Sequence, residues 1–191
     1  VCAKFMLLTG ARITETTAAT WSQIDLEAMT WTIPPENLKD TRALQARRHK
    51  PKQALAIPLS RQAIQLLTDT REAETEQRQL NGLQEEIRKQ DLLFVGPRGS
   101  KLGNWDRWLK ATTATTGMTG WSAHALRRTT ATLAGDLGAP PHIVSVILGH
   151  SNVGGQLVAG YNHSTYGFEH RQILQDVADK LEVIEGSVTY G

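Results

Sequence analysis

The spacing of apolar residues along the chain predicts a mainly helical protein. Helical spacing covers residues 13–24, 64–67, 105–109, 123–137, 141–149 and 169–184. Ser60 is a suitable N-cap for the second of these helices, and Pro141 is suited to the first turn of the fifth. Residues 71–89 are rich in Glu and Gln with few apolar positions, which predicts an exposed helix or a mobile insertion.

Two short segments are typical of strands instead. Residues 31–33 (Trp-Thr-Ile) end at a Pro-Pro pair, and residues 54–59 (ALAIPL) form a second apolar run. Together they predict an antiparallel hairpin with a long loop. Residues 92–95 predict a short buried piece that ends in a turn. The expected fold class is therefore mainly α, with a small antiparallel β-hairpin or sheet.

Composition limits the class of protein. Apolar residues make up 40% and charged residues 21% of the 191, values typical of a soluble globular domain. No apolar run reaches the roughly 20 residues of a membrane span, and no secretory signal is expected. Cys2 stands alone, so the sequence offers no internal disulfide and no cysteine-based zinc site. We expect a cytoplasmic protein.

Charge is distributed unevenly, although the net charge is only +2. Residues 72–91 and 169–185 are acidic, whereas residues 39–52 are strongly basic. The basic segment holds six cations against the single acid Asp40: Lys39, Arg42, Arg47, Arg48, Lys50 and Lys52. Such a run is typical of contact with nucleic-acid phosphates, although a solvated charged loop has the same composition.

Five short segments suggest a specific chemistry when they are taken together. They are Thr9-Gly10-Ala11-Arg12-Ile13-Thr14-Glu15, the strand 31–34 continuing to Lys39, His124-Ala125-Leu126-Arg127-Arg128-Thr129, Leu148-Gly149-His150, and Gly160-Tyr161-Asn162. Each is common alone, but in this order and spacing they resemble the tyrosine recombinase (phage integrase) family. The resemblance covers nearly the whole chain. Its closest form is the integrases of prophages and genomic islands, in which Tyr, Glu, Arg and a helix follow the motif tyrosine.

The resemblance implies a DNA breaking-rejoining fold and a set of six catalytic residues. Transfer of a phosphodiester to a tyrosine builds negative charge on phosphate oxygens, and the sequence shows no metal-ligand cluster, so cationic side chains must stabilise that charge. The family pattern places Arg12 and Arg127 in this role, since a guanidinium reaches two oxygens and keeps its proton. Arg128 points about 100° away from Arg127 on a helix. No cofactor and no metal are expected.

The same pattern assigns the remaining four roles. Tyr161 is the expected nucleophile, and it needs help to lose a proton because a free tyrosine has a pKa near 10. His124, three residues before Arg127, accepts or passes that proton. His150 hydrogen-bonds the scissile phosphate, and Lys39 protonates the leaving 5′ oxygen.

Two departures from the family pattern leave alternatives open. The loop after Lys39 is longer than usual, so Lys50 or Lys52 could be the general acid. Tyr166 is the rival nucleophile, because the eleven-residue gap from His150 to Tyr161 is slightly long. Three histidines and one tyrosine are expected to have no catalytic role: His142, His163 and His170, as cap, loop or surface residues, and Tyr190.

The resemblance also implies a function and its partners. We expect residues 1–191 to be one catalytic domain, a fragment without its upstream DNA-binding domains, of a metal-independent site-specific DNA recombinase that forms a 3′-phosphotyrosyl intermediate. Its expected partners are double-stranded DNA with att-type sites, further protomers in a tetrameric synapse, and accessory DNA-bending or directionality proteins, all at the nucleoid and none in a membrane. The amphipathic helix over 169–185 is a candidate protomer contact. A type IB topoisomerase and a DNA-binding fragment without catalysis are the alternatives.

Overall fold

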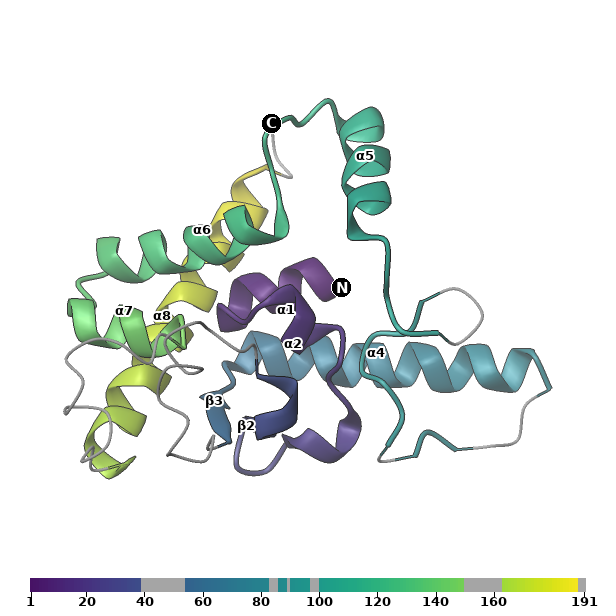
Figure 1. The fold of residues 1–191 in the computed structure, drawn as a ribbon, viewed down its shortest axis with the longest axis horizontal. Helices are drawn as coiled ribbons and strands as arrows, with labels where there is room; N and C mark the ends of the chain where they lie inside the picture. Colours follow the sequence, from purple (N-terminus) through teal and green to yellow (C-terminus); the bar gives the residue numbers. More distant parts are fainter. Residues whose placement is uncertain (39–53, 83–85, 89, 97–99, 150–162, 189–191) are drawn as a thin grey trace.

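A computed structural model describes residues 1–38, 54–82, 86–88, 90–96, 100–149 and 163–188, with only the backbone described at 163–166 and 188. Helices surround one small sheet (Figure 1). The elements in order are α1 (Cys2–Thr9), α2 (Ile13–Thr16), η1 (Trp21–Gln23), β1 (Ile24–Asp25), β2 (Thr30–Ile33), η2 (Pro35–Asn37), β3 (Leu55–Pro58), α4 (Arg61–Leu80), α5 (Trp105–Thr116), α6 (Ala123–Asp136), α7 (Pro141–Ile147) and α8 (His163–Val188). None of the helices in these ranges is long and apolar enough to cross a membrane.

The predicted hairpin is confirmed and is part of a slightly larger sheet. Strand β2 pairs antiparallel with β3, with Trp31 opposite Ile57. On its other side β2 pairs with β1, a two-residue strand that the sequence did not reveal, so the strand order is β1-β2-β3. Trp31 and Ile33 both point into the core, because alternate residues of a strand share one face.

The prediction of one helix over residues 13–24 is wrong. Helix α2 ends at Thr16, and Ile24 lies in strand β1. The next residues pair with a distant segment instead: the Trp21 amide donates to the Asp91 carbonyl (3.1 Å), and the Leu93 amide donates to the Ala19 carbonyl (2.9 Å). Leu93 is fully buried, so this pairing explains why residues 92–95 include a buried piece.

The other predicted helices are confirmed, with some changes of length. The Ser60 hydroxyl accepts from the Ala63 amide (3.2 Å) and caps α4 as expected. That helix runs on to Leu80, so the polar stretch 71–89 begins as a continuation of it rather than as a separate element. Pro141 does open α7. Helix α8 begins at His163, earlier than predicted.

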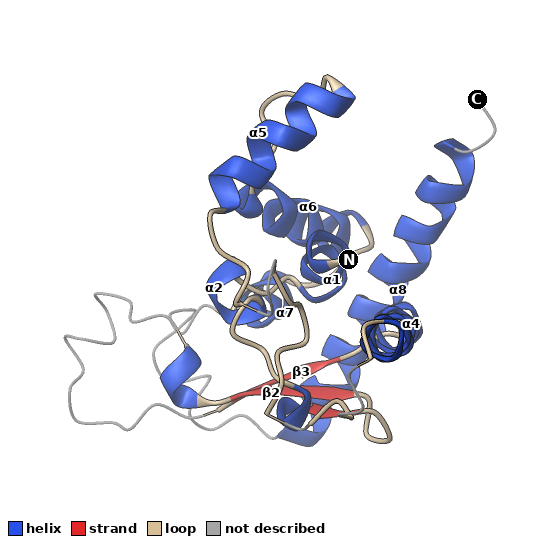
Figure 2. Cartoon of the chain, turned by 90° about the vertical axis from the view of Figure 1, so that its right-hand side faces the viewer, coloured by secondary structure: helices blue, strands red, loops and turns tan. Residues whose placement is uncertain are grey.

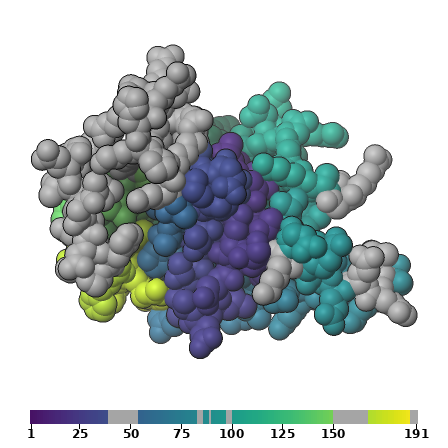
Figure 3. All heavy atoms as spheres, turned by 60° about the horizontal axis from the view of Figure 1, so that its bottom comes forward, coloured from purple at the N-terminus to yellow at the C-terminus, as the bar shows by residue number. Residues whose placement is uncertain are grey.

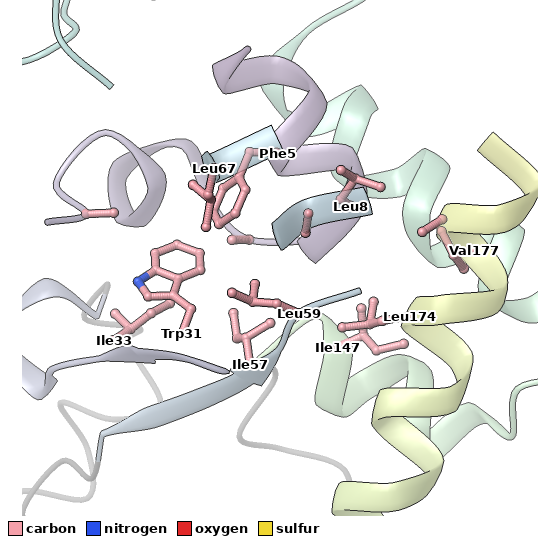
Figure 4. Packing of buried hydrophobic residues seen from close by; sticks show 14 of the residues in the cluster. Phe5, Leu8, Trp31, Ile33, Ile57, Leu59, Leu67, Ile147, Leu174 and Val177 are labelled. Atoms are coloured by element: carbon pink, nitrogen blue, oxygen red, sulfur yellow. The ribbon is translucent and has the colours of Figure 1, made fainter. Parts of the chain in front are cut away.

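The core lies between the sheet and the helices (Figure 4). Phe5 of α1 packs against both Trp31 and Phe94, with ring centroids 5.3 Å apart in each pair. Helix α8 packs on α1, α4, α6, α7 and β3 of its own chain, burying Leu174 and Val177. This core holds α1, α6 and α7 together, and their ends form the candidate site.

Helix α5 differs from the other α-helices, since none of its residues is buried. It stands apart from the helices around the core (Figure 2). The segment after it leads directly into α6, which carries two of the predicted catalytic residues.

Candidate active site

The turn after α1 places the first predicted arginine. Gly10 adopts φ +66°, and its amide donates to the Met6 carbonyl (2.8 Å), which closes α1. A Cβ at this position would lie 2.8 Å from Cγ2 of Ile147 in α7, so both the backbone angle and the close approach require glycine. The chain leaves this turn through Ala11, and Arg12 becomes the N-cap residue of α2.

Glu15 holds Arg12 at two points. Its Oε2 accepts from the Arg12 backbone amide and its Oε1 accepts from Arg12 Nη1, both at 2.9 Å. The Glu15 side chain is 1% exposed, whereas that of Arg12 is 20% exposed. The carboxylate is therefore a buried anchor, and part of the guanidinium remains accessible.

Arg127 of α6 reaches across to the same turn. Its Nη1 donates to the Gly10 carbonyl (2.6 Å), and its Nη2 donates to the Leu148 carbonyl just after α7. Thr130, one turn later on α6, donates from its hydroxyl to the Leu7 carbonyl of α1 (2.8 Å). The arginine that the sequence selects thus lies at the junction of α1, α6 and α7.

The two predicted arginines meet at one atom. Arg12 Nη2 also donates to the Leu148 carbonyl (3.4 Å), and to the Gly149 carbonyl (3.5 Å). Burial and the positive charge of Arg12 lower the pKa of Arg127 to about 10, and Glu15 opposes that shift. The guanidinium of Arg127 therefore keeps its charge at neutral pH. Two cations beside one carboxylate leave a net positive site, which favours an anion.

Residues close to Arg12 adjoin two segments that contain other predicted site residues: the segment that begins at His150 and the basic segment 39–52. A Cβ on Gly149 would lie 3.4 Å from Cδ2 of Leu55 and 3.5 Å from Arg12 Nη1. Gly149 directly precedes His150, and Leu55 opens β3 just after the basic segment 39–52. Gly149 therefore lies close to both Arg12 and Leu55.

His124 lies in the first turn of α6, three residues before Arg127, and its side chain is exposed. The Ser122 hydroxyl caps this helix by accepting from the Ala125 amide (3.0 Å). Arg128 is exposed while Arg127 is 7% exposed, so the predicted separation of the two neighbours is confirmed. The structure gives no contact between His124 and the arginine pair.

The remaining predicted site residues lie outside the described residues. They are Lys39, His150 and Tyr161 of the catalytic set and Arg42, Arg47, Arg48, Lys50 and Lys52 of the phosphate-binding set. The structure thus brings together Arg12 and Arg127, with His124 one helix turn from Arg127. The catalytic roles of these three residues, and of Lys39, His150 and Tyr161, stay predictions.

One histidine was misassigned. His170 was expected to be a cap, loop or surface residue, but it is 4% exposed, and its Nε2 has no hydrogen-bond partner among the residues that the structure describes. Burial, with a smaller effect from Arg171, lowers its pKa to about 4. Its neighbours Glu169 and Arg171 are exposed, because adjacent side chains of a helix point about 100° apart. His163 begins α8, and His142 lies half-buried in α7.

Sequence reasoning also missed parts of the site. It assigned no role to Glu15, although the three-residue spacing from the N-cap Arg12 is that of a capping box. It also could not predict that the Gly10 and Leu148 carbonyls bind Arg127, because every residue has a backbone carbonyl and the sequence does not distinguish these two. A hollow at the start of α5, lined in part by Lys101, Arg107 and Trp108, includes none of the predicted residues.

Comparisons with known proteins agree with this architecture. The XerA recombinase structure matches with a TM-score of 0.58 at 18% identity, over 90% of this chain and 56% of that one. The integrase of mycobacterium phage Brujita matches with a TM-score of 0.58 at 16% identity, over 92% and 51%. The Tn1549 transposon integrase in complex with transposon right end DNA matches with a TM-score of 0.55 at 22% identity, over 78% and 50%. No curated protein sequence matched the chain.

These structures share the fold, and the chain spans about half the length of each. The predicted mainly helical fold with a small antiparallel sheet is therefore confirmed as that of tyrosine recombinase catalytic domains. A sequence profile of the phage integrase family matches residues 1–167, which include every predicted catalytic residue. The chain belongs to the phage integrase family.

Proposed function

We propose that the chain is the catalytic part of a site-specific DNA recombinase, which cleaves and rejoins DNA through a 3′-phosphotyrosyl link. The observation that carries this proposal is the convergence of Arg12 and Arg127 on the Leu148 carbonyl. Two guanidinium groups from separate helices meet there although they repel each other. Such an arrangement is useful when an anion binds between them.

The reaction explains why these groups are wanted. Attack on a phosphodiester places extra negative charge on the non-bridging oxygens, and preorganised cations stabilise that charge without rearranging. Each guanidinium can present two N–H groups to a phosphate. Glu15 and the backbone carbonyls already orient both side chains, so little conformational entropy is lost when the anion arrives.

The other roles follow from family membership. Tyr161 Oη forms the bond to phosphorus as the bond to the 5′ oxygen breaks, and His124 takes up or relays the tyrosine proton. His150 hydrogen-bonds the phosphate, and Lys39 gives a proton to the 5′ oxygen. An exposed His124 one turn from Arg127 is compatible with access to bound DNA.

The proposed substrate is double-stranded DNA with att-type sites. Structures of the Tn1549 integrase are complexes with DNA, which supports DNA as the ligand of this related chain. Arg42, Arg47, Arg48, Lys50 and Lys52 would neutralise its phosphates. Assembly into a tetrameric synapse, accessory DNA-bending or directionality proteins, and a cytoplasmic location at the nucleoid belong to the same proposal.

Covalent capture tests the proposal. A nicked suicide substrate releases a short strand after cleavage and so traps the protein on the DNA. We expect an adduct that Tyr161→Phe abolishes and that Arg12→Ala or Arg127→Ala slows by about 10²–10³, with EDTA having no effect. DNA retardation without an adduct would identify a binding fragment. Relaxation of supercoiled plasmid without strand exchange would identify a topoisomerase instead.

A further inference from the structure

One arginine of helix α8 binds the backbone of the turn that joins two strands of the sheet. Arg171 donates from Nη2 to the Ala28 carbonyl (3.2 Å) and from Nη1 to the Met29 carbonyl (3.3 Å). These two carbonyls lie in the turn between β1 and β2. The guanidinium thus bridges two elements that lie more than 140 residues apart in the chain.

The turn is built to present these carbonyls. Met29 adopts φ +50°, a left-handed conformation that costs a non-glycine residue about 1 kcal/mol or more. The Leu59 amide donates to the Met29 carbonyl (2.8 Å), and the Thr30 hydroxyl donates to the Ala28 carbonyl (3.0 Å). The surroundings therefore hold a strained turn in the form that Arg171 binds.

Helix α8 packs on the core through apolar residues, and the Arg171 bonds add a directional contact to this packing. Leu174, Val177 and Ala178 are buried along one side of the helix. Apolar contacts are not directional. The polar bonds that hold the helix further along lie on its α4 side, where Gln62 donates to Asp179 (2.7 Å) and to Glu182 (2.8 Å). The bond pair of Arg171 has direction and fixes α8 against the sheet.

The position of the bridge links it to the proposed chemistry. Helix α8 begins two residues after Tyr161, and Arg171 lies ten residues after that tyrosine. Strands β2 and β3 border the segment with Lys39 on either side. Arg171 therefore joins the helix that follows the proposed nucleophile to the sheet that flanks the proposed general acid.

We propose that Arg171 is a positioning residue for strand cleavage, which sets Tyr161 in line with the phosphate through its bonds to the Ala28 and Met29 carbonyls. This inference rests on the proposed function. It concerns a single step: the Tyr161 Oη–phosphorus bond forms, the phosphorus–5′ oxygen bond breaks, the tyrosine loses its proton and the 5′ oxygen gains one. Arg171 itself does not contact the phosphate in this proposal.

Arg171→Ala and Arg171→Lys test it, with Arg61→Ala as the matched control. Arg61 is also an exposed arginine that binds α8, through Asp179 (3.4 Å), but it meets the helix eight residues further from Tyr161. Adduct formation on the nicked substrate should slow about tenfold to a hundredfold in Arg171→Ala, because small misplacements of a reacting group cost that much. DNA affinity and Tm should stay close to wild type. Arg171→Lys should recover part of the rate, and Arg61→Ala should cleave normally. Wild-type cleavage by Arg171→Ala, or equal slowing by both alanine variants, would overturn the proposal.

A small nucleophile separates positioning of the tyrosine from damage to the rest of the site. In a Tyr161→Phe protein, added hydrogen peroxide can supply the attacking oxygen, and the phosphorus–5′ oxygen bond breaks as before. Peroxide-dependent cleavage should be the same with Arg171 and with Arg171→Ala, since peroxide needs no helix to place it. A parallel loss there would show that Arg171 serves phosphate binding, which contradicts the inference. An adduct that persists in Tyr161→Phe would instead refute the proposed nucleophile, whatever Arg171 does.

Discussion

The carboxylate of Glu15 binds Arg12 through both of its oxygens, one to the backbone amide and one to the guanidinium, at 2.9 Å each. One side chain therefore binds the backbone amide of the N-cap residue of α2 and also orients the guanidinium of that residue. Arg12 faces the Leu148 carbonyl with its remaining amino group. The orientation of the candidate phosphate-binding group therefore depends on a residue that does not itself reach the phosphate.

Replacing this carboxylate should impair cleavage more than DNA binding. Glu15→Gln keeps the shape but removes the charge, so one of the two bonds is lost and the two arginines repel each other without compensation. We expect adduct formation to slow about tenfold to a hundredfold and the free energy of unfolding to fall by about 2–3 kcal/mol. Single-turnover cleavage and urea unfolding measure the two effects.

Glu74→Gln is the control for this prediction. Glu74 binds Arg78 at 2.7 Å on α4, where both side chains are partly exposed. Its loss should cost less than about 1 kcal/mol and leave cleavage unchanged. If Glu15→Gln cleaves DNA as fast as Glu74→Gln, the orientation of Arg12 does not depend on the carboxylate.

Local signals predicted much of this structure. The Pro-Pro pair after Ile33, the capping hydroxyl of Ser60 and Pro141 at the start of α7 act within one or two turns of themselves, so the sequence displays them directly. The expectation that Arg127 and Arg128 point in different directions is also confirmed, because helix periodicity alone separates adjacent side chains.

Distant pairing explains what could not be predicted. Residues 17–23 do not continue the α-helix because Ala19 and Trp21 bind backbone partners about 70 residues later, and no local pattern predicts such a partner. Burial of His170 likewise depends on which face of α8 meets the core. The shared Leu148 carbonyl arises only after α1, α6 and α7 have packed together.

Gly10→Ala should disturb the same junction from the backbone side. The new methyl group would lie 2.8 Å from Cγ2 of Ile147 and would strain a residue at φ +66°. Gly138→Ala is the control, since Gly138 has φ +86° but nothing within 4 Å of a Cβ. Both variants bear a left-handed penalty of about 1 kcal/mol. Gly10→Ala should lose about 1–3 kcal/mol more in urea unfolding, from the clash. Equal losses would mean that α7 moves aside without cost.

Acid should destabilise the protein through His170. Its pKa is about 4 in the folded chain, below the ordinary value of 6.5, so the unfolded chain binds the extra proton first as pH falls. The neutral folded form is favoured fully above pH 6.5, and this advantage disappears as pH falls from 6.5 to 4. The difference corresponds to about 3 kcal/mol. Urea unfolding at pH 7 and pH 4.5 measures it.

His170→Phe should remove this part of the pH dependence, because the phenyl ring does not titrate. His124→Gln is the control, because it also removes a histidine but from an exposed position on α6. A His170→Phe protein that loses as much stability between pH 7 and pH 4.5 as wild type would place the acid sensitivity elsewhere.

The identity of the general acid is tested by changing the leaving group. A 5′ alkoxide is strongly basic and needs a proton as it leaves, whereas a 5′ thiolate does not. Lys39→Ala should therefore slow cleavage of an ordinary substrate strongly, yet cleave a 5′-bridging phosphorothiolate at nearly the wild-type rate. Lys50→Ala and Lys52→Ala should instead weaken binding to any DNA sequence and reduce its salt dependence, since each removes one phosphate contact. If the phosphorothiolate substrate restores cleavage by Lys50→Ala or Lys52→Ala but not by Lys39→Ala, the general acid is that lysine of the loop after Lys39. Rescue of none of the three would mean that another group supplies the proton.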